Sequence, residues 1–348
     1  MDLDSPGDYA AVDPADALGD VEATAQQWAD AATLGPGRLD LQGFDAVVVS
    51  GMGGSGISGD ILWALSLEGY RLPVVVHKGY GVPGFTGPRT LVVALSHSGG
   101  TEETLSAFDE AGRRGATRLV VTGGETLAER AAAEGAHVAR VPGGSRPPRH
   151  SLGVLLVPVL VALGLDDGLD EAVRVLSTLA QELGREAPAN PAKQLAVRLA
   201  AGVVPLTWGG HGIGSVAAYR MKCQLNENAK MPAVHGELPE ADHNDVVGWE
   251  STSALAGVAA LLGFRDPAGE HPRVARRFEL TTELLADRLA WSADIVARGS
   301  SPLARVASLL FQADIISVYT ALASDRDPTP IASIDRLKAK LGTTAAAR

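Results

Sequence analysis

The sequence has few cysteines, few aromatic residues and little clustered positive charge. Its single cysteine, Cys223, excludes an internal disulfide and a thiolate metal cluster, which fits a reducing compartment. Acidic residues outnumber basic ones and give a net charge of −11. This balance argues against a nucleic-acid partner, because phosphate backbones are bound by clustered Lys and Arg. A small anionic ligand stays possible, since a pocket responds to the few groups that line it.

Long hydrophobic runs are also missing. No uninterrupted apolar stretch reaches membrane-spanning length, and the acidic residues 1–16 lack the basic and apolar regions of a secretory signal. These absences predict a cytoplasmic protein without membrane contact. A chain of 348 residues with 46 % hydrophobic and 20 % charged residues is typical of an α/β protein of about two domains.

Short β-branched runs alternate with helical patterns in the first half of the chain. We expect strands at 46–49, 74–77, 91–95, 119–122 and 137–141, with helices at 57–70, 102–112 and 126–134. Such alternation predicts a mostly parallel sheet covered by helices on both faces, a doubly wound domain.

A Pro- and Gly-rich segment, residues 142–148, ends this half of the chain. The predicted organisation is an N-terminal helical segment (1–40), a first domain (41–150), a helical linker (151–190) and a second domain with C-terminal helices (191–348). Helices are expected at 273–290 and 304–323, and a terminal helix is expected to end at Gly342 as its C-cap.

The loop GMGGSG follows the first predicted strand and begins a helix. Its glycines allow close approach of a ligand, and the free amides of a helix N-terminus attract phosphate, so Gly54 and Ser55 are candidate phosphate-binding residues. A tight turn without ligand is the alternative. The loop is a weak dinucleotide fingerprint, because His77 and Lys78 stand where an acidic residue would hold the ribose.

A second loop, SHSGGTEET, follows another apolar strand. Ser96, Ser98 and Thr101 supply hydroxyl groups at the start of a helix, on the same edge of a parallel sheet as the first loop. The two helix ends could therefore converge on one anion. Ordinary helix capping by Ser and Thr is the alternative.

A similar arrangement returns in the second half, where GGHGIGS lies between a β-type run and an amphipathic helix. The sequence leaves open whether this reflects an internal duplication or a chance likeness of two glycine-rich turns.

Several motifs together resemble one family. GMGGSGISGD and SHSGGTEET are similar to the phosphate-holding loops of the sugar isomerase (SIS) fold. PPRHSLG, LNENAKMPAVHGELPEADHNDVVGW and DPTPIASIDRLKAKL resemble, in the same order, the remaining signatures of the bifunctional phosphoglucose/phosphomannose isomerases. The resemblance implies two SIS-type doubly wound domains, each a three-layer αβα sandwich.

The resemblance also implies roles for individual residues. Glu227 within NENAK would carry a proton between C1 and C2 of the sugar, and His243 within DHND would open the sugar ring. Lys338 would assist His243, and Arg149 would stabilise the charge of an enediolate. Without the resemblance, Glu227, His243 and Lys338 would be solvated residues and Arg149 a surface ion pair.

Two features depart from the family pattern. His97 and Gly100 stand in the second loop where relatives usually have an aromatic residue and an asparagine. The family accepts either configuration at C2 through small residues before the terminal lysine, and in this sequence Thr329 and Ile331 precede Lys338.

The implied function is a metal-independent, cofactor-free interconversion of glucose 6-phosphate, and of mannose 6-phosphate, with fructose 6-phosphate. In the family the histidine comes from a second subunit, so a homodimer with shared active sites is implied. The alternative from another class is a sugar-phosphate sensor that keeps the fold without chemistry. An amidotransferase-linked aminosugar isomerase is a third hypothesis, and it would need a glutaminase domain for which the chain has no room.

Overall fold

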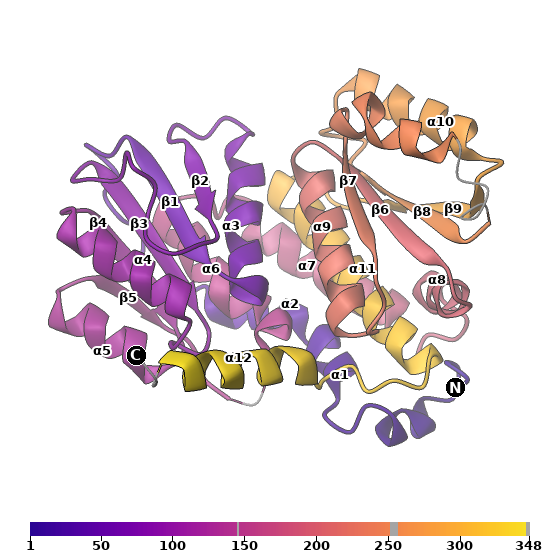
Figure 1. The fold of residues 1–348 in the computed structure, drawn as a ribbon, viewed down its shortest axis with the longest axis horizontal. Helices are drawn as coiled ribbons and strands as arrows, with labels where there is room; N and C mark the ends of the chain where they lie inside the picture. Colours follow the sequence, from indigo (N-terminus) through magenta and orange to yellow (C-terminus); the bar gives the residue numbers. More distant parts are fainter. Residues whose placement is uncertain (145, 251–256, 346–348) are drawn as a thin grey trace.

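The computed structural model describes residues 1–144, 146–250 and 257–345, and it contains two parallel sheets joined by helices (Figure 1). The chain begins with the short helices η1 (Pro6–Ala11), α1 (Ala17–Glu22) and α2 (Thr24–Ala31). These helices pack against later elements, with α2 lying on α6 (Leu152–Leu163) and α7 (Leu169–Leu183). The N-terminal segment is therefore part of the central helical layer.

The first sheet has five parallel strands in the order β2-β1-β3-β4-β5. Their bounds are β1 (Ala46–Gly51), β2 (Val74–His77), β3 (Thr90–Ser96), β4 (Thr117–Thr122) and β5 (His137–Arg140). The connecting helices are α3 (Gly53–Ser66), α4 (Glu102–Arg113) and α5 (Glu125–Ala133). The connection after β1 leads to β2 on one side of the sheet, and the connection after β3 leads to β4 on the other side. A ligand crevice is therefore expected between the ends of β1 and β3.

Both faces of the first sheet are buried. Alternate strand residues such as Val47 and Val93 join the large core that contains α3 and α6. Their neighbours Val48 and Val92 face the small apolar residues of α4 on the other side. This alternation produces the three-layer sandwich that the sequence predicted.

The second sheet repeats the plan with four parallel strands in the order β7-β6-β8-β9. Its strands are β6 (Val204–Gly210), β7 (Val234–Leu238), β8 (Ala259–Arg265) and β9 (Leu289–Val296). Helices α8 (Pro191–Ala200), α9 (Ile213–Glu227) and α10 (Pro272–Leu285) accompany them, together with the one-turn helices η3 (Glu240–His243) and η4 (Asp245–Trp249). The predicted two-domain α/β fold is confirmed by these two sheets.

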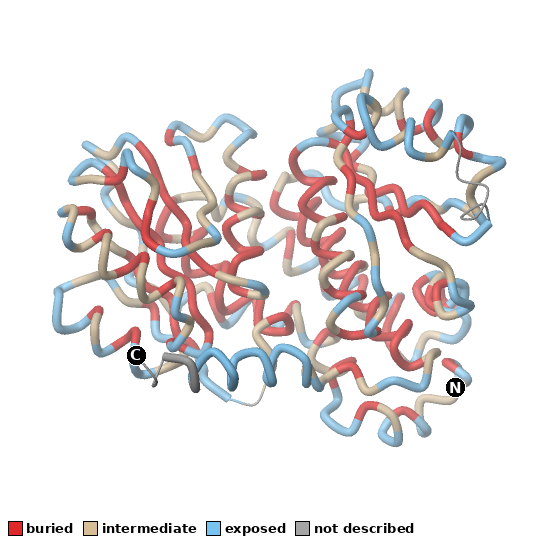
Figure 2. Tube along the Cα trace, in the orientation of Figure 1, coloured by how far each residue is buried: buried red, intermediate tan, exposed pale blue. Residues whose placement is uncertain are grey.

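The helix α11 (Pro302–Ala323) packs against α7, α8 and α9 and is buried over almost its whole length (Figure 2). It is long and apolar enough to cross a membrane, although the sequence was expected to hold no such segment. Because 89 % of its most apolar window is buried inside the protein, its composition is explained by a place in the core.

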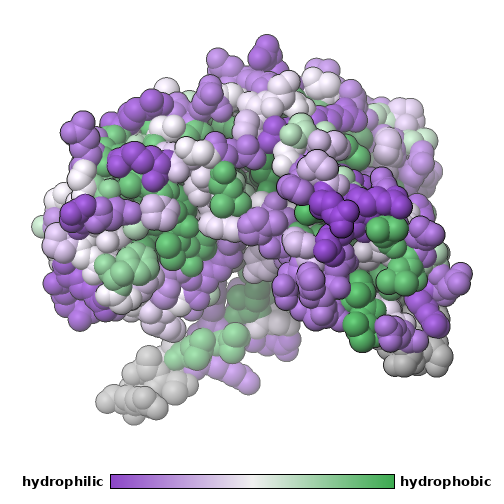
Figure 3. All heavy atoms as spheres, turned by 90° about the horizontal axis from the view of Figure 1, so that it is seen from above, coloured by the Kyte–Doolittle hydropathy of each residue, from purple (hydrophilic) through white to green (hydrophobic). Residues whose placement is uncertain are grey.

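The last helix, α12 (Ala332–Ala345), contrasts with α11. Every residue from 332 to 342 is exposed, and the helix runs along the lower edge of the molecule in the view of Figures 1 and 2. Seen from above, α12 projects from the body of the molecule (Figure 3). Gly342 lies inside α12, so its prediction as a C-cap was wrong.

Candidate active site

The loop after β1 forms the first part of the site. Met52 takes the N-cap position of α3 in an extended conformation, and among the described residues no side chain caps this helix end. Ser55 is buried in the first turn, where its Oγ accepts a hydrogen bond of 3.3 Å from the backbone N–H of His97. The N–H groups of Ser55 and Gly56 donate to the Met52 carbonyl oxygen at 3.0 and 3.1 Å, so the amides of Gly53 and Gly54 are the ones left for an anion. The serine links this loop to the one after β3.

The loop after β3 forms the second part. The hydroxyls of Ser96 and Thr101 lie 3.0 Å apart, and Ser96 Oγ also accepts from the N–H of Gly99 at 3.1 Å. Thr101 is the N-cap of α4 but its side chain does not cap the helix. The ordinary capping alternative is therefore not what the described residues adopt. Ser98 is exposed and accepts from the N–H of Gly100 at 3.4 Å.

The first loop lies directly against η2 (Pro148–His150), which carries Arg149. A Cβ atom built on Gly54 would lie 2.7 Å from the backbone nitrogen of Arg149 and 2.8 Å from the carbonyl carbon of Pro148. Glycine is thus required at position 54 by the space available. This contact brings the first phosphate-type loop and Arg149 together.

Arg149 is buried, with only 2 % of its surface exposed, and so is not the surface ion pair of the alternative interpretation. Its Nε donates to Asn228 Oδ1 at 2.6 Å, and its Nη2 donates to the carbonyl oxygens of Pro328 and Thr329 at 2.8 Å each. Burial lowers the pKa of Arg149, while the nearby carboxylate of Glu227 acts in the opposite direction.

Glu227 is the last residue of α9, and its Oε2 lies 3.4 Å from Arg149 Nη1. The Glu227 side chain keeps 26 % of its surface exposed. A partly accessible carboxylate beside a buried guanidinium provides a proton acceptor next to a fixed positive charge. A substrate atom placed beside this pair would contact both groups.

A buried polar network binds the backbone carbonyl of Arg149. Arg220 on α9 donates from Nη2 to the Arg149 carbonyl oxygen at 2.8 Å and forms a two-point ion pair with Asp314 on α11 at 2.7 and 2.6 Å. Gln224 donates to the same Asp314 at 2.8 Å. Sequence reasoning missed this network, although a carboxylate inside the apolar α11 was a detectable signal.

The structure does not bring His243 or Lys338 to this cluster. His243 ends η3, next to Asp242, which pairs with Arg277 on α10. Lys338 lies on α12, and α10 and α12 are at opposite sides of Figure 1. Both side chains are exposed, and in the described part of the chain no hydrogen bond or ion pair joins either of them to Glu227.

The equivalent edge of the second sheet has different chemistry. A cavity of about 360 Å³ lies there, between the loop after β6 and the loop after β8. Its lining includes the carboxyl groups of Glu68, Asp266 and Glu270. Each of these carboxyl groups forms an ion pair with Arg265 or Arg305, so this cleft differs from the hydroxyl-bearing loops of the first domain.

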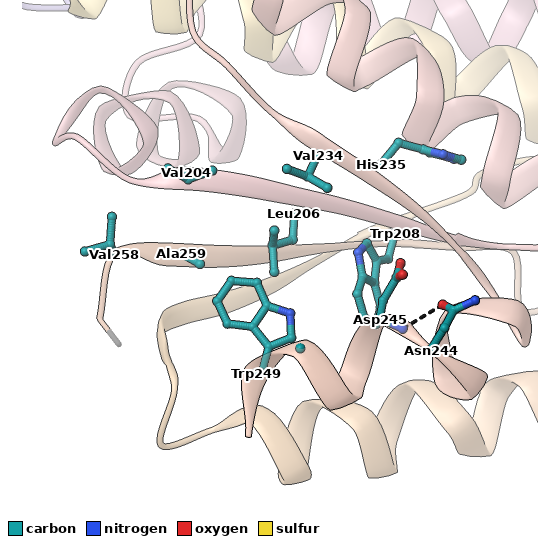
Figure 4. Close-up of a pocket in the computed structure, with 11 residues that line it drawn as sticks. Val204, Leu206, Trp208, Val234, His235, Asn244, Asp245, Trp249, Val258 and Ala259 are labelled. Atoms are coloured by element: carbon teal, nitrogen blue, oxygen red, sulfur yellow. Dashed lines mark hydrogen bonds between the residues drawn. The ribbon is translucent and has the colours of Figure 1, made fainter. Parts of the chain in front are cut away.

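A second cavity, of about 630 Å³, lies on the outer face of the second sheet (Figure 4). Trp208 and Trp249 line it together with valine and leucine side chains. Its polar edge is Asn244, whose Oδ1 accepts from the N–H of Asp245 at 2.6 Å. The walls are mostly apolar, so this cavity does not suit a sugar phosphate. Among the residues that the structure describes, no group of three His, Cys, Asp or Glu side chains could hold a metal ion.

Comparison with solved structures defines the class of protein. The chain is similar to the C-terminal domain of glucosamine-fructose-6-phosphate aminotransferase from Francisella tularensis, with a TM-score of 0.69 and 12 % identity over 90 % of this chain and 98 % of the other. Residues 188–341 match the bacterial phospho-glucose isomerase C-terminal SIS domain. Fold and loops together make this a two-domain α/β protein of the SIS type.

Comparison with curated proteins defines the family. The chain is 38 % identical to the bifunctional phosphoglucose/phosphomannose isomerase of Caldicellulosiruptor bescii, over 87 % of this chain and 91 % of that protein. It is 37 % identical to the enzyme of the same name from Aquifex aeolicus, over 87 % and 92 % of the two chains. The chain belongs to the bifunctional phosphoglucose/phosphomannose isomerase family, which confirms the resemblance found in its motifs.

Proposed function

We propose that the protein interconverts glucose 6-phosphate and fructose 6-phosphate, and that it also accepts mannose 6-phosphate. The observation that carries this proposal is the position of Glu227 next to Arg149, which itself lies against the phosphate-type loop at Gly54. Membership of the family supports the same activity. The protein is proposed to work in the cytoplasm.

The phosphate group is held by the two loops of the first domain. The amides at the start of α3 and the hydroxyls of Ser55, Ser96, Ser98 and Thr101 supply hydrogen bonds to its oxygens. Holding the phosphate there leaves the other end of the open-chain sugar pointing toward Glu227. Anchoring a remote group in this way reduces the entropy cost of the reaction.

Proton transfer is then assigned to Glu227. Its carboxylate removes the proton from C2 of the open aldose, the C2 electrons form the enediol double bond, and the charge moves to the oxygen on C1. Arg149, fixed by Asn228 and by two backbone carbonyls, stabilises this negative charge. The hydroxyl proton on O2 then moves to O1, and return of the carbon-bound proton from Glu227 to C1 gives the ketose, so atoms and charge balance without a metal or cofactor.

Ring opening is assigned to His243 with the help of Lys338. Because neither contacts Glu227 within one chain, we place the histidine of a second copy at the site, in a homodimer with shared active sites. The exposed face of α12 supports a second copy as its partner. Ile334, Leu337 and Leu341, three and four residues apart, are 38 %, 59 % and 53 % exposed and form an apolar stripe.

Acceptance of both aldoses is proposed to depend on Thr329. Its backbone carbonyl binds Arg149, and its hydroxyl is buried without a hydrogen-bond partner among the described residues. A small residue with a free hydroxyl is able to meet either orientation of the C2 hydroxyl, because it offers both a donor and an acceptor.

A coupled assay on purified protein tests the activity. Fructose 6-phosphate should form from both aldoses, and EDTA should have no effect. E227Q should lower kcat by about a thousandfold, within the range of lost general-base catalysis, while calorimetry still detects binding of fructose 6-phosphate. E283Q, which changes an exposed glutamate of α10, is the matched control and should keep full activity. Absence of turnover with both aldoses, or an E227Q variant as active as wild type, would contradict the proposal.

A further inference from the structure

Lys230 follows the end of α9 in a conformation that usually belongs to glycine. Its φ is +53°, and the N–H of Met231 closes the helix by donating to the carbonyl oxygen of Leu225 at 3.1 Å. Glycine adopts this left-handed conformation most readily, since a Cβ atom opposes it. A lysine at this position therefore indicates that contacts of its side chain stabilise the structure enough to offset the unfavourable backbone conformation.

The ammonium of Lys230 is occupied by three backbone carbonyls. Nζ donates to the oxygen of Asn228 at 3.2 Å, to that of Asp327 at 2.6 Å and to that of Pro328 at 3.1 Å. These three bonds use every donor that an ammonium has. One partner lies at the end of α9 and the other two lie in the segment that leads from α11 to α12, so the side chain ties these elements together.

The same segment is also held by Arg149. Its Nη2 donates to the carbonyl oxygens of Pro328 and Thr329, so two cations share the three consecutive carbonyls of residues 327–329. Arg149 is bound in turn by Asn228 and faces Glu227. Lys230, Arg149 and the segment thus form a closed set of contacts around the proposed base.

We propose that Lys230 is a positioning residue of the isomerisation, whose ammonium joins the end of α9 to residues 327–329 and so keeps Glu227 and Arg149 facing each other. This inference rests on the proposed function of Glu227. Lys230 itself touches no reacting atom. Its effect is on the geometry of the transition state more than on binding of the sugar phosphate, which is held by the loops after β1 and β3.

The charges around Lys230 make its contribution depend on pH. Burial and the positive charge of Arg149 lower the pKa of Lys230 to about 8, with Arg326 acting in the same direction. Asp327 and Glu227 oppose this change. Above pH 8 the ammonium therefore loses its charge and one donor, and the segment is held less firmly.

The test compares K230M, K230R and the control K222M, which removes a lysine from the preceding helix α9. K230M should lower kcat about tenfold to a hundredfold with KM almost unchanged, because misplacing a base affects the transition state. K230R, which stays charged, should recover most of kcat and should keep its activity above pH 8, where wild type declines. K222M should behave as wild type.

Each outcome separates the hypotheses. An inactive wild type would refute the proposed function itself. An active wild type with a fully active K230M, or with a K230M that changes only KM, would refute the role of Lys230. If K230M does not fold, as judged by circular dichroism, the pH profile of K230R decides: an alkaline decline identical to that of wild type overturns the inference.

Discussion

Gly54 and Gly100 lie in the two phosphate-type loops but have different surroundings. Alanine is normally the better helix former, so G54A in the first turn of α3 would be stabilising if space allowed. Its Cβ would instead meet the backbone of Pro148 and Arg149 at 2.8 and 2.7 Å, whereas nothing lies within 4 Å of a Cβ on Gly100. We expect G54A to lower the free energy of unfolding by about 1 to 3 kcal/mol.

G54A should also lower kcat/KM, because η2 would carry Arg149 away from Glu227. Urea denaturation and the coupled assay measure the two effects. G100A is the control and should stay within about 0.5 kcal/mol of wild type. A G54A variant as stable as G100A would show that η2 shifts without a loss of folding free energy. The close contact between residue 54 and η2 would then not constrain the residue at this position.

The positions of the site residues relative to one another were partly predictable from the sequence. Ser55, Ser96 and Thr101 follow strands that could be recognised by their β-branched runs, so their meeting at one sheet edge followed from topology. The bonds of Lys230 and Asn228 were not predictable. Both bind groups nearly a hundred residues away, and no local pattern encodes such pairings.

At the scale of elements, the strands of the first sheet were predicted better than helix ends, whereas β7, β8 and β9 were not predicted. β2 has the predicted bounds, because its four-residue run is enclosed by turn residues on both sides. The helix expected at 273–290 was too long, since α10 ends at Leu285 and β9 begins at Leu289. The alternating exposure along β9 was hidden in the sequence by the helical pattern before it.

The start of α11 depends on a contact from α7. The carboxylate of Glu171 accepts from the N–H groups of Ser300 and Ser301 at 2.6 and 3.0 Å. These hydrogen bonds to the charged form lower the pKa of Glu171 to about 2 from its usual 4.5. A lowered pKa in the folded state means that the stabilisation is present above pH 4.5 and is lost as the pH falls toward 2.

We therefore expect E171Q to be less stable than wild type at pH 7 and to approach it as the pH falls from 4.5 toward 2. Urea denaturation at several pH values measures this difference. E186Q, at an exposed glutamate in the segment after α7, is the control and should follow the wild-type curve. A constant difference between E171Q and wild type at every pH would contradict the role of the charge.

At the scale of the whole molecule, the two sheets share one connectivity. In each, the first strand lies between the second and the third, which matches the similar loops GMGGSG and GGHGIGS in the sequence. This supports an internal duplication over a chance likeness.

The exact division of the chain at residues 41–150 and 191–348 stays a prediction. The two halves differ in chemistry, because the second cleft is lined by carboxylates and the first by hydroxyls.

In the proposed homodimer, each active site takes Glu227 from one chain and His243 from the other. This arrangement predicts that two inactive variants regain activity when they form a mixed dimer. E227Q lacks the proposed base and H243A lacks the proposed ring-opening group, so each homodimer should be inactive on sugar phosphates in their closed form. In a mixed dimer one site combines the intact Glu227 of one chain with the intact His243 of the other. Random pairing gives half mixed dimers with one working site of two, so about a quarter of wild-type activity should return.

The two variants, carrying different affinity tags, can be produced together and the doubly tagged dimers isolated before the assay. These should show about half of the wild-type rate per dimer, whereas each variant produced alone should show none. Light scattering gives the mass of the assembly in the same samples. A folded mixed dimer without activity would show that no site combines Glu227 of one chain with His243 of the other, and would refute the shared site. A monomer with full activity would require that one chain bring the two residues together by a rearrangement of η3 and α9.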